Sequence, residues 1–196
     1  MAIEDLRRGL HESLDRRLAP LSRALLRLGI TPNHVTVCGT AIALGAPVLL
    51  IAGRPLAAGI VWLVGSSFDL LDGALARSQG RATRSGALLD STLDRIAEGA
   101  LFAAIAYDFA AAGRPAAAGL TVLALLGALL ISYIRARIEG LGGRCVVGLV
   151  TRAERVVLLA VGLCFGVMLP VIYLLVLLSA ISAAQRLRHG LRELAQ

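Results

Sequence analysis

Long apolar runs separated by short polar breaks constrain this chain more than any other feature. Hydrophobic residues make up 57% of its 196 residues and the mean hydropathy is +0.78, which is outside the range of ordinary soluble domains. A run of about 20 apolar residues can cross the hydrocarbon core of a bilayer as a helix. The sequence predicts six such spans, over residues 33–53, 56–78, 84–111, 115–138, 148–168 and 171–189. We therefore expect an all-α integral membrane protein with six transmembrane helices.

The breaks between these runs predict how the spans are oriented. Gly53-Arg54-Pro55, Gly113-Arg114-Pro115 and Leu169-Pro170 predict short hairpins on one side of the membrane, because glycine and proline favour turns. Nearly all of the twenty basic residues, every one an arginine, fall on the other side. Basic loops are retained in the cytoplasm. The chain is thus expected to be a multi-pass protein of the cell membrane, with its arginine-rich side facing the cytoplasm.

Residues 2–19 have the pattern of an amphipathic helix that lies on the membrane surface. Leucine recurs there at every fourth residue, at Leu6, Leu10, Leu14 and Leu18. Such a helix buries its apolar face among the lipid headgroups and turns its arginines toward anionic lipids. Two regions follow: a juxtamembrane helix and lead-in over 1–30, and a six-helix domain over 31–196. Nucleic acid is not an expected partner, because the chain has little soluble surface to carry a basic face.

Four aspartates stand where the second and third spans meet their cytoplasmic ends. Asp69 and Asp72 share one face of a helix, and Asp90 and Asp94 share a face of the next, since residues three or four apart are neighbours on a helix. A single charged side chain at membrane depth costs about 2.5–3.5 kcal/mol on insertion scales. Cations are therefore needed to offset four carboxylates.

Two sources of positive charge are open. Nearby arginines could pair with the acids at a wet helix end: Arg77, Arg81, Arg84 and Arg95. The other source is a metal ion, because carboxylate oxygens suit hard cations such as Mg²⁺ or Mn²⁺. Gly73 and Gly86 each lie close to an acid, where a missing side chain lets another group approach the backbone. These glycines favour a metal site over a purely structural cluster.

The same stretch resembles the signature of a known family. The pattern Asp69-x2-Asp72-Gly73-x2-Ala76-Arg77-x8-Gly86-x3-Asp90-x3-Asp94 is similar to that of the CDP-alcohol phosphotransferase (CDP-alcohol phosphatidyltransferase) family, with every position present. Six spans, an amphipathic N-terminal helix and a Thr-Pro-Asn turn before the first span also fit that family. Residues 132–137, 140–142 and 152–155 resemble a narrower group, the prokaryotic phosphatidylinositol phosphate synthases.

The resemblance implies a reaction. A phosphatidyl group would pass from CDP-diacylglycerol to the hydroxyl of an alcohol, with release of CMP. The narrower group implies a phosphorylated polyol, 1D-myo-inositol 3-phosphate (L-myo-inositol 1-phosphate), and phosphatidylinositol phosphate as the product. Arg135 stands where such synthases commonly carry a lysine, so the acceptor stays open, with glycerol 3-phosphate and a phosphatidylglycerophosphate synthase as the alternative. The family also implies a homodimer.

The resemblance also implies roles for individual residues. Asp69, Asp72, Asp90 and Asp94 would hold two Mg²⁺ ions, with Mn²⁺ as a substitute, and Asp94 would also act as the general base. The CDP-lipid would contact Thr31, Pro32, Asn33, His34, Gly73, Ala76, Arg77, Thr83 and Gly86. Arginine makes paired hydrogen bonds to phosphate oxygens, so three arginines on the cytoplasmic side are predicted to bind the acceptor phosphate: Arg135, Arg155 and Arg186. Each of them could instead be an ordinary basic flank of a span.

Two other classes of membrane protein use intramembrane acids. Intramembrane prenyltransferases bind Mg²⁺ and a lipid diphosphate, but their acids come in two separated groups and their bundles are larger. A cation transporter lines its ion path with acids, but the paired halves or interrupted helices common in transporters are not evident in this sequence. Metal-dependent release of CMP would distinguish a phosphotransferase from both.

Overall fold

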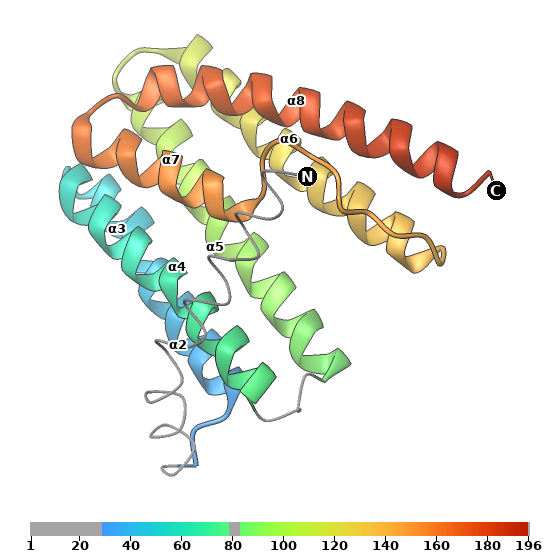
Figure 1. Ribbon diagram of the computed structural model, residues 1–196. Helices are drawn as coiled ribbons and strands as arrows, with labels where there is room; N and C mark the ends of the chain where they lie inside the picture. The colour runs from blue at the N-terminus through green and yellow to red at the C-terminus, as the bar shows by residue number, and fades with distance from the viewer. Residues whose placement is uncertain (1–28, 79–82, 196) are drawn as a thin grey trace. The chain divides into compact units, whose positions relative to one another are not determined.

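The computed structural model describes residues 29–78 and 83–195, with only the backbone described for residues 70 and 72–78. Every element of regular structure within these residues is a helix. The helices are α2 (Pro32–Ala43), α3 (Gly45–Ile51), α4 (Pro55–Ser78), α5 (Arg84–Ala111), α6 (Pro115–Gly140), α7 (Arg152–Phe165) and α8 (Met168–Glu193) (Figure 1). The all-α prediction is confirmed for this part of the chain, whereas the amphipathic helix predicted over 2–19 lies outside it.

Three helices among the described residues are long and apolar enough to cross a membrane. They are Pro32–Ile51, Pro115–Gly140 and Met168–Glu193, and Pro55–Asp69 forms a shorter apolar helix. The first of these spans is interrupted by a turn at Leu44, between α2 and α3. These helices agree with a membrane protein, and the count of six spans stays a prediction.

Both Gly-Arg-Pro breaks form the predicted turns. Gly53 and Gly113 have φ angles of +73° and +70°, a conformation that glycine adopts without steric cost. In each turn the arginine N–H donates to the carbonyl five residues earlier at 2.9 Å, which closes the end of the preceding helix. The proline that follows begins α4 or α6, a position where its missing N–H has no helical partner to lose.

The third predicted break, at Leu169-Pro170, is wrong by a few residues. The chain turns at Gly166 and Val167 instead, and α8 already begins at Met168. Gly166 has a φ of +67° and ends α7 in the left-handed conformation, as glycine commonly does. Pro170 lies in the first turn of α8, where a proline is tolerated because the first N–H groups of a helix are unpaired.

The span predicted over 148–168 is also shorter than expected, because α7 begins only at Arg152. Gly148 has a φ of +133°, which is incompatible with a helix. The Arg186 side chain lies against it, and its Nε donates to the Val147 carbonyl at 2.9 Å. The non-helical segment before α7 is thus held by a side chain of α8.

The chain divides into two compact units, which are described separately. The described part of the first unit consists of residues 29–43, 64–78 and 83–97. In it α2 and the second part of α4 approach closely at glycines. A Cβ at Gly39 would collide with the Phe68 side chain, and a Cβ at Gly65 would lie 2.5 Å from the Ala43 nitrogen. Small residues of this kind let membrane helices pack backbone to backbone.

We expect Gly65→Ala to destabilise the protein. The added methyl group would lie 2.5 Å from the nitrogen and 2.7 Å from the Cα of Ala43, so the backbone itself has to move. Overpacking of this kind costs about 1–3 kcal/mol. Thermal unfolding in detergent measures the effect, and Gly119→Ala, where a Cβ meets nothing within 4 Å, is the control. Equal unfolding midpoints for the two variants would contradict this packing.

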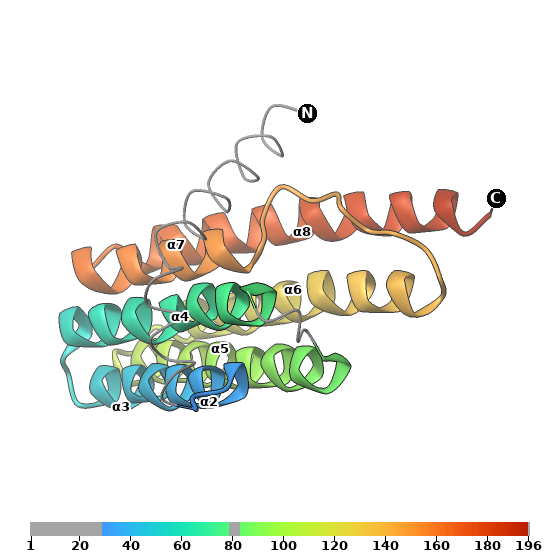
Figure 2. The ribbon, with the colours of Figure 1, turned by 60° about the horizontal axis from the view of Figure 1, so that its bottom comes forward.

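The second unit consists of residues 44–63 and 98–196. Helices α6 and α8 lie side by side in it, and α7 packs against α8 (Figures 1 and 2). Its core contains the largest fully buried side chains, among them Trp62, Phe102, Leu101, Ile105, Ile131, Leu159, Ile172 and Leu175. Trp62 Nε1 donates to the Val156 carbonyl at 3.2 Å, which satisfies its buried polar atom and joins α4 to α7.

Candidate active site

Three of the four predicted aspartates meet in the first unit. Asp69 comes from α4, and Asp90 and Asp94 lie one turn apart on α5. One carboxylate oxygen from each lies within 4.8 Å of the other two. Asp94 is 7% exposed, and the other two are half-buried. The prediction that neighbouring helices direct their acids toward one another therefore agrees with the geometry of these three.

The aspartate cluster has an unmatched oxygen. Oδ1 of Asp90 is buried and accepts no hydrogen bond from any described residue. A buried carboxylate oxygen without a partner is costly, and a divalent cation is a partner that carboxylates take up. Three carboxylates at this spacing, one with a vacant acceptor, fit a hard divalent cation.

Arg95 on α5 is an arginine that contacts the cluster. Arg95 Nη1 lies 3.6 Å from Asp94 Oδ2, but it donates its hydrogen bond to the Ser91 carbonyl at 2.6 Å. Arg84 is exposed at the first turn of α5, and the side chains of Arg77 and Arg81 lie outside the described residues. Arg95 thus offsets part of the charge and leaves the Asp90 oxygen without a partner.

Some predicted residues fall where the structure gives no side chains. Asp72, Gly73, Ala76 and Arg77 belong to the last turns of α4, of which only the backbone is described. Asp72 follows Asp69 by three residues on this helix, so the two positions share a face. The predicted roles of these four residues remain predictions.

The beginning of α5 gathers three of the residues predicted to contact the CDP-lipid. Thr83 caps the helix, because its Oγ1 accepts a hydrogen bond from the Gly86 N–H at 3.0 Å. A Cβ at Gly86 would lie 3.1 Å from Asn33 Oδ1. The missing side chain of Gly86 therefore lets the Asn33 side chain approach the N-terminus of α5 closely. Helix N-termini of this kind bind phosphate oxygens.

The turn before α2 is closed by reciprocal hydrogen bonds. The Thr31 N–H donates to His34 Nδ1 at 3.4 Å, and the His34 N–H donates to Thr31 Oγ1 at 3.3 Å. Pro32 occupies the first position of the helix, which its fixed φ favours. His34 thus has a capping role at the start of α2, next to Asn33.

The three arginines predicted to bind the acceptor phosphate all lie in the second unit. Arg186 is buried and donates to the carbonyls of Val147 and Ile131 at 2.9 and 2.8 Å. Arg186 thus joins α8 to α6 and to the segment before α7.

The other two arginines each have an acidic partner. Arg135 is exposed, and its Nε donates to Glu139 Oε1, four residues later, at 2.8 Å. Arg155 is buried and donates to both oxygens of Glu98, at 2.7 and 2.8 Å. Sequence reasoning missed Glu98, although its spacing is a signal: Asp90, Asp94 and Glu98 recur at every fourth residue of α5.

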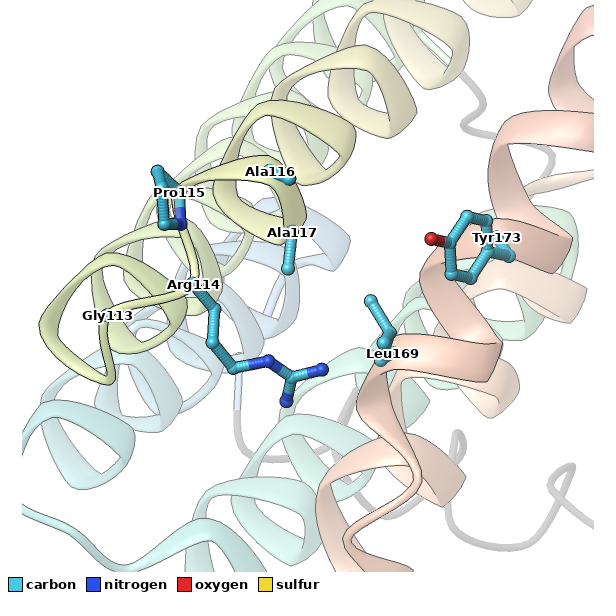
Figure 3. A pocket seen from close by; sticks show the side chains of 7 residues that line it. All are labelled: Gly113, Arg114, Pro115, Ala116, Ala117, Leu169 and Tyr173. Atoms are coloured by element: carbon cyan, nitrogen blue, oxygen red, sulfur yellow. The ribbon is translucent and has the colours of Figure 1, made fainter.

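A separate recess of about 340 Å³ lies in the second unit, at the turn between α5 and α6 and near the start of α8. The Arg114 guanidinium and the Tyr173 side chain border it, and Ala117, Pro115 and Leu169 supply its apolar walls (Figure 3). Among the described residues, those that line it include no acidic residue, histidine or cysteine. The recess lacks metal ligands, and we place the candidate active site at the aspartates.

Comparison with known proteins points to one family. The family model for CDP-alcohol phosphatidyltransferase matches residues 29–185. A phosphatidylinositol phosphate synthase of Mycobacteroides abscessus is 39% identical over 183 residues, which covers 88% of this chain and 82% of that protein. The family match includes the aspartates, Arg135 and Arg155, and ends one residue before Arg186.

Solved structures agree with this similarity. A crystal structure of Mycobacterium tuberculosis phosphatidylinositol phosphate synthase with CDP-DAG bound has a TM-score of 0.81 and 34% identity, and the match covers 89% of this chain and 94% of that one. The same synthase in complex with manganese and citrate also has a TM-score of 0.81 and 34% identity, and covers 88% of both chains. The similarity in fold thus extends over most of the chain.

Proposed function

Because this chain belongs to the CDP-alcohol phosphatidyltransferase family, we propose that it transfers the phosphatidyl group of CDP-diacylglycerol to a phosphorylated polyol. The acceptor is inositol phosphate, 1D-myo-inositol 3-phosphate, and the products are phosphatidylinositol phosphate and CMP. The chain is a membrane-bound transferase of phospholipid biosynthesis. The observation that carries this proposal is the meeting of Asp69, Asp90 and Asp94 within 4.8 Å, on a motif of this family.

The reaction replaces one bond to phosphorus with another. The acceptor hydroxyl oxygen bonds to the phosphorus of the phosphatidyl group, the bond from that phosphorus to the oxygen shared with CMP breaks, and CMP leaves. An alcohol hydroxyl does not ionise near neutral pH, so its proton needs a base within hydrogen-bond reach. Asp94 takes the proton, a role that the family resemblance implies for this position.

The aspartates would hold two divalent cations, Mg²⁺ with Mn²⁺ as a substitute. The family resemblance implies this role for four residues: Asp69, Asp72, Asp90 and Asp94. Such ions neutralise the charge that develops on phosphate oxygens in phosphoryl transfer. Support comes from the partnerless Asp90 Oδ1 and from the manganese complex of the M. tuberculosis synthase.

CDP-diacylglycerol would be held beside the metals by the residues predicted from the motif. Asn33, Thr83 and Gly86 line the N-terminus of α5, where backbone N–H groups attract phosphate. Arg77 adds a positive charge from the end of α4 in this proposal. The bound CDP-DAG of the M. tuberculosis synthase supports the choice of donor.

The proposed membrane arrangement has six spans and an interfacial N-terminal helix, formed by regions 31–196 and 1–30. The arginine-rich ends of the spans face the cytoplasm, which is where a soluble phosphorylated acceptor would be met. A site at helix ends lets the acyl chains stay in the bilayer while the nucleotide stays in water. A homodimer is proposed from the family resemblance.

Offering different acceptors tests the proposed function most directly. Purified protein receives CDP-diacylglycerol, Mg²⁺ and one radiolabelled acceptor at a time: inositol 1-phosphate, free inositol or glycerol 3-phosphate. Labelled lipid is expected with inositol phosphate alone. Labelled lipid with glycerol 3-phosphate alone would replace the proposal with a phosphatidylglycerophosphate synthase, and use of free inositol alone would overturn the need for an acceptor phosphate.

We expect Arg135→Ala to raise the acceptor KM about tenfold and to leave the donor KM little changed. A hydrogen bond to a charged group contributes about 1.5–3 kcal/mol, and Arg135 is exposed enough to exchange Glu139 for a ligand. Initial rates measured against each substrate separate the two KM values. Arg137→Ala, an exposed neighbour on the same helix, is the control. An equal rise in acceptor KM for both variants would indicate a diffuse effect of charge.

A further inference from the structure

One buried ion pair in the second unit has no part in the proposal so far. Arg155 Nε donates to Glu98 Oε1 at 2.7 Å, and Arg155 Nη2 donates to Glu98 Oε2 at 2.8 Å. The two side chains are only 3% and 4% exposed. Burying two charges in this way adds little net stability, because the loss of hydration offsets their attraction. Stability alone is therefore a poor reason for the pair.

The geometry of the pair determines how the guanidinium is presented. A guanidinium is planar and carries five N–H donors in a fixed arrangement. Because Nε and Nη2 both donate to one carboxylate, the orientation of the guanidinium plane is fixed. The direction of the third nitrogen, Nη1, is fixed with it. Nη1 of Arg155 makes no hydrogen bond to any residue that the structure describes. Its two N–H groups, together with the second N–H of Nη2, are the donors left for a ligand.

Glu98 lies on the helix that also carries two aspartates of the candidate site. Glu98 follows Asp94 by one turn on α5. Arg155 lies in the first turns of α7, whose start is closed by a capping box: the Thr151 N–H donates to Glu154 Oε2 at 2.8 Å. The N-terminal end of a helix carries partial positive charge. The positively polarised end of α7 thus carries Arg155.

We propose that Glu98 is a positioning residue for the acceptor phosphate, acting through Arg155. Its carboxylate holds the guanidinium in the orientation that leaves Nη1 for a phosphate oxygen. This inference rests on the proposed function, in which Arg155 binds the acceptor phosphate. Glu98 itself has both oxygens occupied by Arg155, so it contacts neither substrate nor metal in this role.

A double-mutant cycle tests whether Glu98 acts through Arg155. The variants are Glu98→Gln, Arg155→Gln and the double variant. The double variant removes both charges, so it leaves no buried charge without a partner. Glu98→Gln is expected to raise the inositol phosphate KM about tenfold or more, as small misorientations of binding groups do, with the CDP-diacylglycerol KM changed less than about twofold. When Arg155→Gln is already present, Glu98→Gln is expected to raise the inositol phosphate KM by less than about a further twofold.

Controls separate positioning from folding. Asp108→Asn removes one negative charge from the exposed far end of the same helix and is expected to leave both KM values unchanged. CDP-diacylglycerol binding reports whether each variant is folded. If Glu98→Gln does not bind this donor, Glu98→Asp decides instead, because it keeps the charge on a shorter side chain and is expected to raise the acceptor KM selectively.

Several outcomes overturn the inference without touching the proposed function. The first is a wild-type inositol phosphate KM in the folded Glu98 variant. The second is a double variant in which the two effects multiply, because Glu98 would then act independently of Arg155. The third is an equal rise in the donor KM. A wild-type protein that uses only free inositol would instead refute the proposed function, and this inference would fail with it.

Discussion

Asp94→Asn is expected to lower turnover at least about 100-fold, the lower end of what a general base contributes, while CDP-diacylglycerol binding is largely kept. Asparagine has the size of aspartate and still offers an oxygen to a metal, but it cannot accept the hydroxyl proton. Asp94 is 7% exposed and has Arg95 3.6 Å away. A neutral asparagine leaves no buried negative charge there, and the Arg95 side chain, 36% exposed, can keep its charge in water. The measurement is the rate of CMP release at saturating substrates, together with donor affinity.

The outcome of this substitution distinguishes two roles of Asp94. Turnover within a few-fold of wild type would remove Asp94 as the base. A parallel loss of turnover and of metal affinity would make it chiefly a metal ligand, so the metal concentration for half-maximal rate is measured on the same variant. Asp108→Asn, on the exposed far end of α5, controls for loss of one negative charge from this helix.

Removal of divalent cations is expected to abolish CMP release, and Mg²⁺ or Mn²⁺ is expected to restore it. Asp69, Asp90 and Asp94 present oxygens within 4.8 Å of one another, and Asp90 Oδ1 has no described partner. Without a cation the cluster and the diphosphate of the donor would repel each other. The measurement is CMP release after treatment with a chelator, followed by titration of each metal.

Asp90→Asn extends this prediction to a single residue. The metal concentration for half-maximal rate is expected to rise at least tenfold, since even outer partners of metal ligands change affinity about 10–100-fold. Direct measurement of Mn²⁺ binding provides a readout that does not depend on activity. Full activity in excess chelator, or unchanged Mn²⁺ affinity in Asp90→Asn, would refute the metal site.

Much of the local structure could be predicted because it depends on near neighbours. The two Gly-Arg-Pro turns were predictable, since a glycine with positive φ and a following proline are enough to end one helix and begin another. The same rule failed at Pro170, because Gly166 ends α7 first. The late start of α7 could not be predicted, because it depends on a contact with a distant helix. Arg186 of α8 donates to the Val147 carbonyl and so binds the segment that precedes α7.

The candidate site was predictable to the extent that it is a repeat on a helix. Spacings of three and four residues place Asp69 with Asp72 and Asp90 with Asp94, whatever else the chain does. Glu98 continues that repeat, yet its partner Arg155 is 57 residues away. No local pattern identifies such a pair. The sequence therefore predicted a role for Arg155 but not its partner Glu98.

By itself the sequence determined that the chain is helical and apolar, which acids share a helix face, and which family it resembles. These properties follow from composition, from periodicity and from a motif with fixed gaps, all of which are read over short distances. Only the tertiary structure decided that Asp69 meets Asp90 and Asp94, and that Glu98 fixes Arg155. The physical reason is that such contacts depend on how helices pack, and packing depends on the shapes of whole helix surfaces. At Gly65, for example, the missing side chain lets the backbone of Ala43 come close.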